Sequence, residues 1–138
     1  MDLSGTGARL YGGRWNSEGK SMLYLASSRA LAMLEVLVHL TPVNIPYNYC
    51  ITEIEVPNDS TAILDKAILP LNWKKVSLPL GLREIGDNFL KKQQHLLMKV
   101  PSSIVEGEYN YLLNPLHPAA KNVMLKNKQP FNFDERLL

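Results

Sequence analysis

The stretch Ser21–Leu40, SMLYLASSRALAMLEVLVHL, decides the fold because two kinds of secondary structure follow one another within it. Its first five residues are short, apolar and include an aromatic, which predicts a β-strand over Ser21–Leu25. Ser27 or Ser28 then offers a side chain that caps a helix, and leucines at helical spacing predict that helix over Arg29–Leu40. The first third of the chain therefore folds as a strand that leads directly into a helix.

Short apolar segments and turn residues alternate along the rest of the chain. A second helix is expected over Leu82–Leu96, because apolar residues recur there at helical spacing. Expected strands are Tyr47–Val56, Thr61–Leu64, Leu97–Val100, Val123–Leu125 and Phe131–Phe133, with an extended path over Ser103–Val105. Irregular or turn segments are expected at Gly5–Gly13, Pro42, Asn58-Asp59-Ser60 and Pro79, and a turn or short helical segment is expected at Asn110–Pro115. This order is not a regular alternation of strand and helix, so it predicts an α+β fold, a compact mixed β-sheet core with flanking helices.

Composition narrows the class of protein. The 138 residues fit one domain, with 46% hydrophobic and 20% charged residues. The apolar runs fall short of a membrane span, and the start at Met1-Asp2 does not resemble a secretory leader. Cys50 is the only cysteine and cannot form an intrachain disulfide, which favours a reducing, cytoplasmic setting. The net charge of +2 is mild, so we expect no membrane partner and no direct nucleic-acid partner.

A second stretch, GTGARLYGGRWN over Gly5–Asn16, indicates a ligand pocket. Glycine lets the backbone approach a ligand, arginine binds phosphate with a planar fork, and an aromatic ring can cover a flat base. Arg9, Arg14 and Trp15 are therefore candidates for contacting a nucleotide. Tyr24, in the strand that follows, is expected within reach of the same pocket.

Other nucleotide and metal motifs do not fit the chain. The glycines do not form a GxGxxG motif between a strand and a helix, so a Rossmann domain is not predicted, and no P-loop is present. His39, His95 and His117 are far apart and only one cysteine exists, so no metal site is expected. His117 and Asn114 are expected to brace a loop by hydrogen bonds, together with Asn110.

Five blocks together resemble a known family: GARLYGGRWN, MLYLASSRALAMLE, GDNFL, VPSSIVEGEYNYLLNPLHP and PFNFDERL. In this order, and over nearly the whole chain, they resemble the RES domain, the toxin half of bacterial RES–Xre toxin–antitoxin pairs. The resemblance implies a fold like that of ADP-ribosyltransferase toxins and an activity that consumes NAD. Members of the family usually begin further upstream with an additional strand. We therefore expect a single RES-like domain over residues 1–138, in which either the start is truncated or the N-terminal edge strand is lacking.

The resemblance also assigns roles to four residues, namely Arg14, Tyr24, Glu35 and Ser102. Arg14 is expected to bind the diphosphate of NAD, and Arg9 is a candidate for the same role. Nicotinamide leaves its ribose as a neutral base, so one carboxylate, Glu35, suffices to stabilise the positive charge that develops on the sugar. Tyr24 is a candidate for stacking on nicotinamide or bonding the ribose, and Ser102 for donating a hydrogen bond to either group.

The leading functional hypothesis is a toxin that cleaves the nicotinamide–ribose bond of NAD by hydrolysis or phosphorolysis. Transfer of ADP-ribose from NAD to a protein is a close alternative. An RNA-acting toxin and a non-catalytic binding module are two further alternatives from other classes. The resemblance implies an Xre-like helix-turn-helix antitoxin that blocks the pocket, and a homodimer or a hetero-oligomer with that antitoxin is expected.

Overall fold

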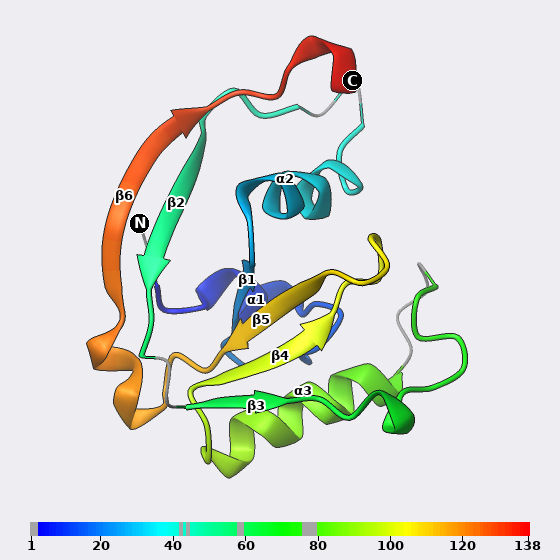
Figure 1. The fold of residues 1–138 in the computed structure, drawn as a ribbon, viewed down its shortest axis with the longest axis vertical. Coiled ribbons are helices and arrows are strands. Elements are labelled where there is room, and N and C mark those ends of the chain that lie inside the picture. The colour runs from blue at the N-terminus through cyan, green and yellow to red at the C-terminus, as the bar shows by residue number, and fades with distance from the viewer. Residues whose placement is uncertain (1–2, 42, 44, 58–59, 76–79) are drawn as a thin grey trace.

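A four-stranded sheet with the order β1-β5-β4-β3 forms the centre of the computed structural model (Figure 1). The structure describes residues 3–41, 43, 45–57, 60–75 and 80–138. The strands of this sheet are β1 (Leu23–Ala26), β3 (Thr61–Ile63), β4 (Leu97–Pro101) and β5 (Tyr109–Leu113). Strand β3 runs parallel to β4, whereas β5 pairs antiparallel with both β4 and β1. The sheet is thus mixed. Strand β5 lies between β1, from the first third of the chain, and β4, from the last third.

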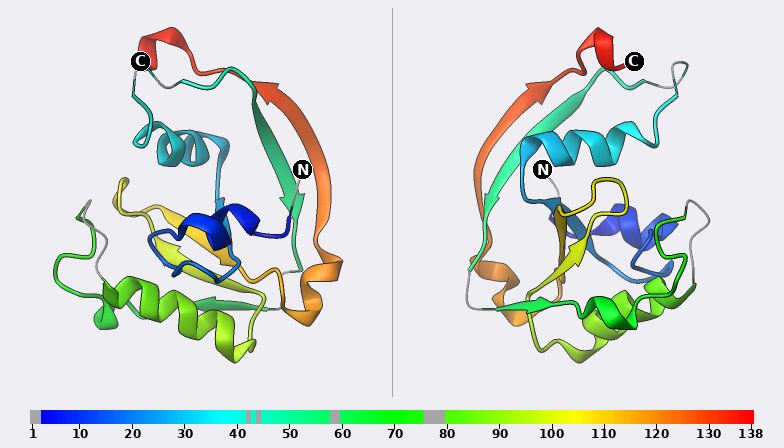
Figure 2. Two further views of the ribbon diagram at one scale, coloured as in Figure 1. Left: turned by 180° about the vertical axis from the view of Figure 1, so that it is seen from behind. Right: turned by 45° about the vertical axis from the view of Figure 1, so that its right-hand side comes forward.

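Two helices cover one face of this sheet. They are α1 (Thr6–Tyr11) and α3 (Leu80–Lys92), and Figure 2 shows both on that face. One core cluster contains Leu82 and Phe89 of α3 together with Val100 and Leu112 of the strands. Ala8 of α1 packs against this cluster. Because four of the five residues of β4 are buried, apolar surface is covered on both sides of this strand.

A separate two-stranded ribbon curves away from the sheet (Figures 1 and 2). It pairs β2 (Tyr49–Glu55) with β6 (Met124–Phe131) in antiparallel register, with an irregularity between Glu53 and Ile54. Only the end of β2 reaches the second core cluster, where Ile54 packs with Leu97 and Leu113. A 3-10 turn, η2 (Pro118–Asn122), covers the same cluster. Two further 3-10 turns are η1 (Lys66–Ile68) and η3 (Glu135–Leu137).

Helix α2 (Arg29–Leu37) follows β1 directly, as the sequence predicts. The Ser28 hydroxyl accepts a hydrogen bond from the Leu31 N–H at 3.1 Å, which confirms the expected cap. The helix ends at Leu37 rather than Leu40, because the N–H groups of His39 and Leu40 bond three residues back instead of four. No helix among the described ranges is long and apolar enough to cross a membrane.

The largest error in the predicted secondary structure concerns Asn110–Pro115, where the sequence predicts a turn or a short helical segment. Residues Tyr109–Leu113 instead form β5, in the interior of the sheet, because hydrogen bonds to two neighbouring strands override a local preference for turns. The path over Ser103–Val105 bends instead of extending, and Gly107 at φ 83° helps to reverse the chain before β5.

Other elements also differ from the prediction. Within the expected irregular stretch Gly5–Gly13, α1 forms between two glycines of positive φ, Gly5 and Gly12. Helix α3 stops at Lys92 instead of Leu96, because Gln93 adopts a left-handed conformation at φ 51°. One continuous β6 replaces the two late strands. Pro42, Asn58-Asp59 and Pro79 lie outside the described residues, and the predicted α+β class is confirmed.

Candidate active site

Alternation along the strands brings three polar side chains to one face of the sheet. The register pairs Tyr24 with Leu112 and Val100 with Asn110, so Tyr24 and Asn110 lie on the same face as these apolar neighbours. Ser102 directly follows β4, and its N–H still bonds the Glu108 carbonyl at 2.9 Å. Ser102 therefore continues the alternation and lies beside Asn110 at the end of the sheet.

Glu35 belongs to α2, the helix above the β4–β5 connection in Figure 1, and its carboxylate reaches Ser102 and Asn110. Its Oε1 accepts hydrogen bonds from Ser102 Oγ at 2.8 Å and from Asn110 Nδ2 at 2.7 Å. Neither donor is charged, so the carboxylate is held in place without losing its negative charge to an ion pair. Its other oxygen, Oε2, accepts no hydrogen bond from the part of the chain that the structure describes.

Ser102 is only 2% exposed, and its hydroxyl takes part in three hydrogen bonds. Its Oγ donates to Glu35 and accepts from the N–H groups of Ile104 and Val105, both at 3.1 Å. A serine has one hydroxyl proton, and Ser102 donates it in the hydrogen bond to Glu35. The geometry thus fixes Ser102 as a support for Glu35 and ties the β4–β5 connection to the same atom.

Arg14 lies near Glu35 but is held by backbone. Its Nη1 donates to the carbonyls of Trp73 and Lys75, at 2.8 and 3.1 Å. Partial burial lowers the pKa of the Arg14 guanidinium from its usual range, while the negative charge of Glu35 acts in the opposite direction. Carbonyl acceptors orient a guanidinium without neutralising it, so Arg14 keeps a charge available for an anion.

Tyr24 connects the N-terminal loop to the sheet. Its hydroxyl donates a short hydrogen bond to Asn16 Oδ1 and accepts one from the Trp15 N–H at 3.2 Å. Desolvation raises the pKa of Tyr24 to about 12, against the smaller lowering effects of the Trp15 N–H, Arg83 and Arg14. Because the hydroxyl is already bonded while the residue is 42% exposed, the ring is the part left for a ligand.

Asn16 organises the loop that carries Arg14. It is fully buried, and its Nδ2 donates to the carbonyls of Ala8, Ser17 and Lys20 at 2.8, 3.2 and 3.0 Å. The loop also depends on Gly13, where an added Cβ would lie 2.6 Å from the Tyr24 hydroxyl oxygen. The glycine-rich stretch thus serves close packing around Tyr24.

Two further residues expected to contact the ligand are Arg9 and Trp15. Arg9 is on the exposed side of α1, and its carbonyl accepts the Gly19 N–H at 2.7 Å. Trp15 is 3% exposed and packs in the core, with only its backbone N–H bonded to Tyr24. Ligand contacts by Arg9 and Trp15 stay predictions from the sequence.

Arg83 is not predicted as a site residue from the sequence, and Asn110 is predicted to stabilise a turn and not to contact Glu35. Arg83 of α3 donates from Nε to the Gly13 carbonyl at 3.1 Å, and its charge acts on Tyr24. Arg83 thus reaches the glycine turn from α3, while Arg14 directly follows Gly13 in the chain, and no described salt bridge involves either arginine. The spacing of Arg83 within an amphipathic helix carries no signal for such a role. Asn110, expected to brace a turn, bonds Glu35 instead, whereas Asn114 and His117 do brace their loop, as predicted.

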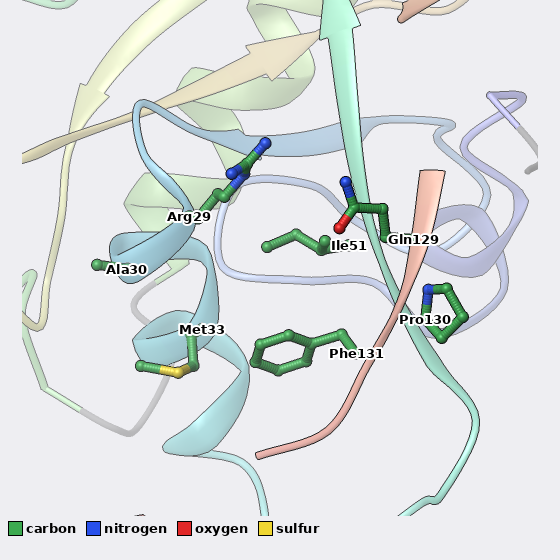
Figure 3. A pocket seen from close by; sticks show the side chains of 7 residues that line it. All are labelled: Arg29, Ala30, Met33, Ile51, Gln129, Pro130 and Phe131. Carbon is green, nitrogen blue, oxygen red and sulfur yellow. The ribbon is translucent and has the colours of Figure 1, made fainter. Parts of the chain in front are cut away.

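Two cavities open on the other side of α2, toward the ribbon. The smaller, about 280 Å³, lies between α2 and the two strands of the ribbon, where Met33 and Phe131 approach one another (Figure 3). The larger, about 700 Å³, reaches from β1 to β2, and Tyr24 is among its lining residues. Arg14, Glu35 and Ser102 line neither of these two cavities. Among the described residues, no three His, Cys, Asp or Glu side chains gather as metal ligands would.

Comparison with known proteins adds a family to this geometry. The RES domain family model matches residues 1–134. A protein of Sphingobium sp. (strain YBL2) named "Prs ADP-ribosylating toxin" is 42% identical over 142 residues, which cover 99% of this chain and 87% of that protein. A "Toxin Res" of Yersinia enterocolitica (serotype O:8 / biotype 1B, strain NCTC 13174 / 8081) is 39% identical, over 97% of this chain and 89% of its own length.

A solved structure shares the fold. It is a chain of the MbcT–MbcA toxin–antitoxin complex of M. tuberculosis, with a TM-score of 0.79 and 20% sequence identity. The match covers 96% of this chain and 78% of that chain. At this identity the likeness concerns the fold alone, and it agrees with the mixed sheet and flanking helices described above.

Proposed function

The chain belongs to the RES domain family, and from that premise we propose that it is an NAD-acting enzyme and the toxin of a toxin–antitoxin pair. The names of the relatives, an ADP-ribosylating toxin and Res toxins, support this function. The observation that carries it is the Glu35 carboxylate, held by the neutral donors Ser102 and Asn110 with one oxygen left over. Residues 1–138 act as one RES-like domain in this proposal.

The proposed reaction breaks the bond between nicotinamide and ribose. The electron pair of that bond leaves with nicotinamide, which departs as a neutral base, and positive charge develops on the ribose. Glu35 stabilises this charge because its carboxylate is preorganised before the reaction begins. Addition of water to the ribose then yields ADP-ribose and a proton, whereas a phosphate or a protein side chain as acceptor yields a transfer product.

Arg14 and Arg83 bind the diphosphate of NAD in this proposal. Backbone carbonyls hold one nitrogen of each guanidinium, at 2.8 and 3.1 Å from Arg14 Nη1 and 3.1 Å from Arg83 Nε. The remaining N–H groups can donate charge-assisted hydrogen bonds to phosphate oxygens. Two arginines from different elements thereby hold the substrate beside the carboxylate.

Tyr24 contributes its ring, because its hydroxyl is already shared between Asn16 and the Trp15 N–H. Stacking on the nicotinamide ring is the contact that such an exposed aromatic face supports. Ser102 acts through Glu35, whose orientation it fixes, and not as a nucleophile. The antitoxin of the pair is proposed to inhibit the enzyme by covering this site.

Two glutamates provide a matched test of the proposal. Glu35→Gln removes the negative charge from the site, and Glu53→Gln removes one from the exposed ribbon, where Glu53 pairs with Arg29. We expect purified Glu35→Gln to consume NAD at least about 100-fold more slowly than the unaltered chain, because an electrostatic contact to the transition state is lost. Glu53→Gln should keep the parent rate. Equal NAD consumption by the parent and Glu35→Gln would refute the assignment.

The acceptor requires a separate experiment. NAD labelled in its adenylate part is incubated with the protein, with and without a cell lysate. Labelled protein in the lysate supports transfer of ADP-ribose, while free ADP-ribose or its phosphate supports hydrolysis or phosphorolysis. The Glu35→Gln variant is the control, since it should release neither product.

A further inference from the structure

Asn110 carries a buried acceptor that has no partner among the described residues. Its Nδ2 donates to Glu35 Oε1 at 2.7 Å, but its Oδ1 is inaccessible to solvent and accepts no hydrogen bond. An unsatisfied buried oxygen lowers stability, so each such atom calls for an explanation. Among the described side chains, no other buried nitrogen or oxygen is left unpaired in this way.

The neighbouring carboxylate fixes which way this amide faces. A carboxylate only accepts hydrogen bonds, so the NH₂ side of Asn110 must face Glu35 and the Oδ1 side must face elsewhere. Exchanging the two ends of the amide would place one oxygen against another and would not remove the unpaired acceptor. The unpaired Oδ1 is therefore a property of the site.

Two other buried asparagines show what a structural role looks like in this fold. Asn114 donates to the Leu90 carbonyl and accepts the Leu116 N–H. Asn16 donates to three carbonyls and accepts from the Tyr24 hydroxyl. Both use donor and acceptor within the protein. Asn110 differs because only its donor side is used.

We infer that substrate binding uncovers Asn110 Oδ1, which then accepts a hydrogen bond from a hydroxyl of the substrate's nicotinamide-side ribose. This inference rests on the proposed function. A ribose presents two neighbouring hydroxyl donors, and Glu35 Oε2 and Asn110 Oδ1 are two acceptors on side chains joined by one hydrogen bond. Asn110 then has two tasks: it orients the carboxylate and it recognises the sugar on which positive charge develops.

Two ligands that differ only by the relevant ribose test this inference. ADP-ribose carries the terminal ribose, whereas ADP lacks it and keeps the diphosphate. Titration calorimetry on the parent and on Asn110→Ala gives both affinities. We expect Asn110→Ala to bind ADP-ribose about tenfold more weakly, as expected for one lost hydrogen bond, with unchanged affinity for ADP.

Asn114→Ala is the matched control, and thermal melting without ligand is its readout. Asn110→Ala removes the unpaired acceptor together with the one hydrogen bond to Glu35, whereas Asn114→Ala breaks two hydrogen bonds, so we expect Asn114→Ala to lower the melting temperature more than Asn110→Ala. An equal loss of ADP and ADP-ribose affinity in Asn110→Ala, or unchanged affinity for both, would overturn the inference and leave the proposed function standing. If the parent binds neither ligand, the proposed function fails and the inference fails with it.

Discussion

The central sheet and the β2–β6 ribbon differ in the partners of their glutamate side chains. In the sheet, β4 is buried along most of its length, and the polar groups at its end bond one another: Ser102 and Asn110 hold Glu35. In the ribbon, β6 is exposed at most positions, and two glutamates of β2 pair with cations, one from α2 and one from β6. These ion pairs are Arg29–Glu53 at 3.1 Å and Lys126–Glu55 at 3.5 Å, between side chains at least half exposed.

The difference lies in what neutralises each carboxylate. An exposed glutamate beside a lysine or arginine has its charge compensated by that partner and by water. Glu35 is held by two neutral donors, so its charge stays available to a ligand. On the proposed function, the reaction therefore takes place at the sheet and its neighbouring loops and not at the ribbon.

The largest expected effect is on packing at the site side of the sheet. A Cβ added at Gly86 of α3 would lie 1.6 Å from the Trp15 carbonyl oxygen. We expect Gly86→Ala to lower the free energy of unfolding by about 3 kcal/mol or more, because backbone must move apart. Urea denaturation measures the change.

Gly7→Ala is the control for this substitution. Nothing lies within 4 Å of a Cβ added at Gly7, which is inside α1. Alanine there should raise the free energy of unfolding by about 0.5–1 kcal/mol. Equal stability of the two variants would show that α3 does not pack against the Trp15 segment as closely as described.

The second effect concerns the two arginines. Arg83→Gln keeps a donor for the Gly13 carbonyl but removes the charge, so we expect KM for NAD to rise about tenfold while the fold persists. Arg29→Gln, beside the ribbon, should leave KM unchanged. Steady-state kinetics on both variants compares them. A rise in KM for Arg29→Gln alone would move the anion site from the sheet to the ribbon side of α2.

The third effect is a pH dependence at Tyr24. Its pKa is raised to about 12, so the folded state favours the neutral phenol. This stabilisation is fully present below about pH 10, the ordinary pKa of tyrosine, and is lost as the pH rises toward 12. A two-unit shift corresponds to about 3 kcal/mol, but with Tyr24 42% exposed we expect about 1 kcal/mol.

Tyr24→Phe isolates this contribution. The stability difference between the parent and Tyr24→Phe should shrink between about pH 10 and 12, as urea denaturation at several pH values would show. Tyr47→Phe, at an exposed tyrosine, controls for the loss of a phenol in general. A difference that stays constant over this range would mean that the Tyr24 hydroxyl is not held as described.

The smallest effect belongs to the ribbon. Glu53→Gln breaks the ion pair with Arg29, and we expect a loss below about 1 kcal/mol, since both side chains are more than half exposed. Chemical denaturation with and without added salt measures it, and salt should reduce the difference further. A loss as large as that of Gly86→Ala would erase the contrast between sheet and ribbon.

Local sequence patterns predicted the elements whose signals are local. Ser28 caps α2 as expected, and the apolar run after it forms a helix because its spacing fits one face. Strand β5 was missed because Asn110 within it and Pro115 after it favour turns, while the hydrogen bonds that stabilise the strand come from β1 and β4. Long-range pairing of this kind leaves no trace in a short window of sequence.

The residues of the candidate site likewise fall into those that the sequence predicted and those that only the structure revealed. Arg14, Tyr24, Glu35 and Ser102 were predicted through the family resemblance, and the structure brings Glu35 and Ser102 into contact at 2.8 Å. Asn110 and Arg83 escaped because their roles depend on contacts with Glu35 and Gly13, which are distant in the chain. Only the fold turns an ordinary strand asparagine and a helix arginine into neighbours of the site.

The position of β5 in the interior of the sheet has a consequence for the cell that makes this protein. Tyr24 and Glu35 lie in the first third of the chain, while Ser102 and Asn110 lie in the last third and meet them only when β5 inserts between β1 and β4. A ribosome that has translated two thirds of the message therefore holds a nascent chain whose carboxylate still lacks both of its supports. On the proposed function, toxicity begins only once synthesis is nearly complete, which leaves the antitoxin an interval in which to be present first.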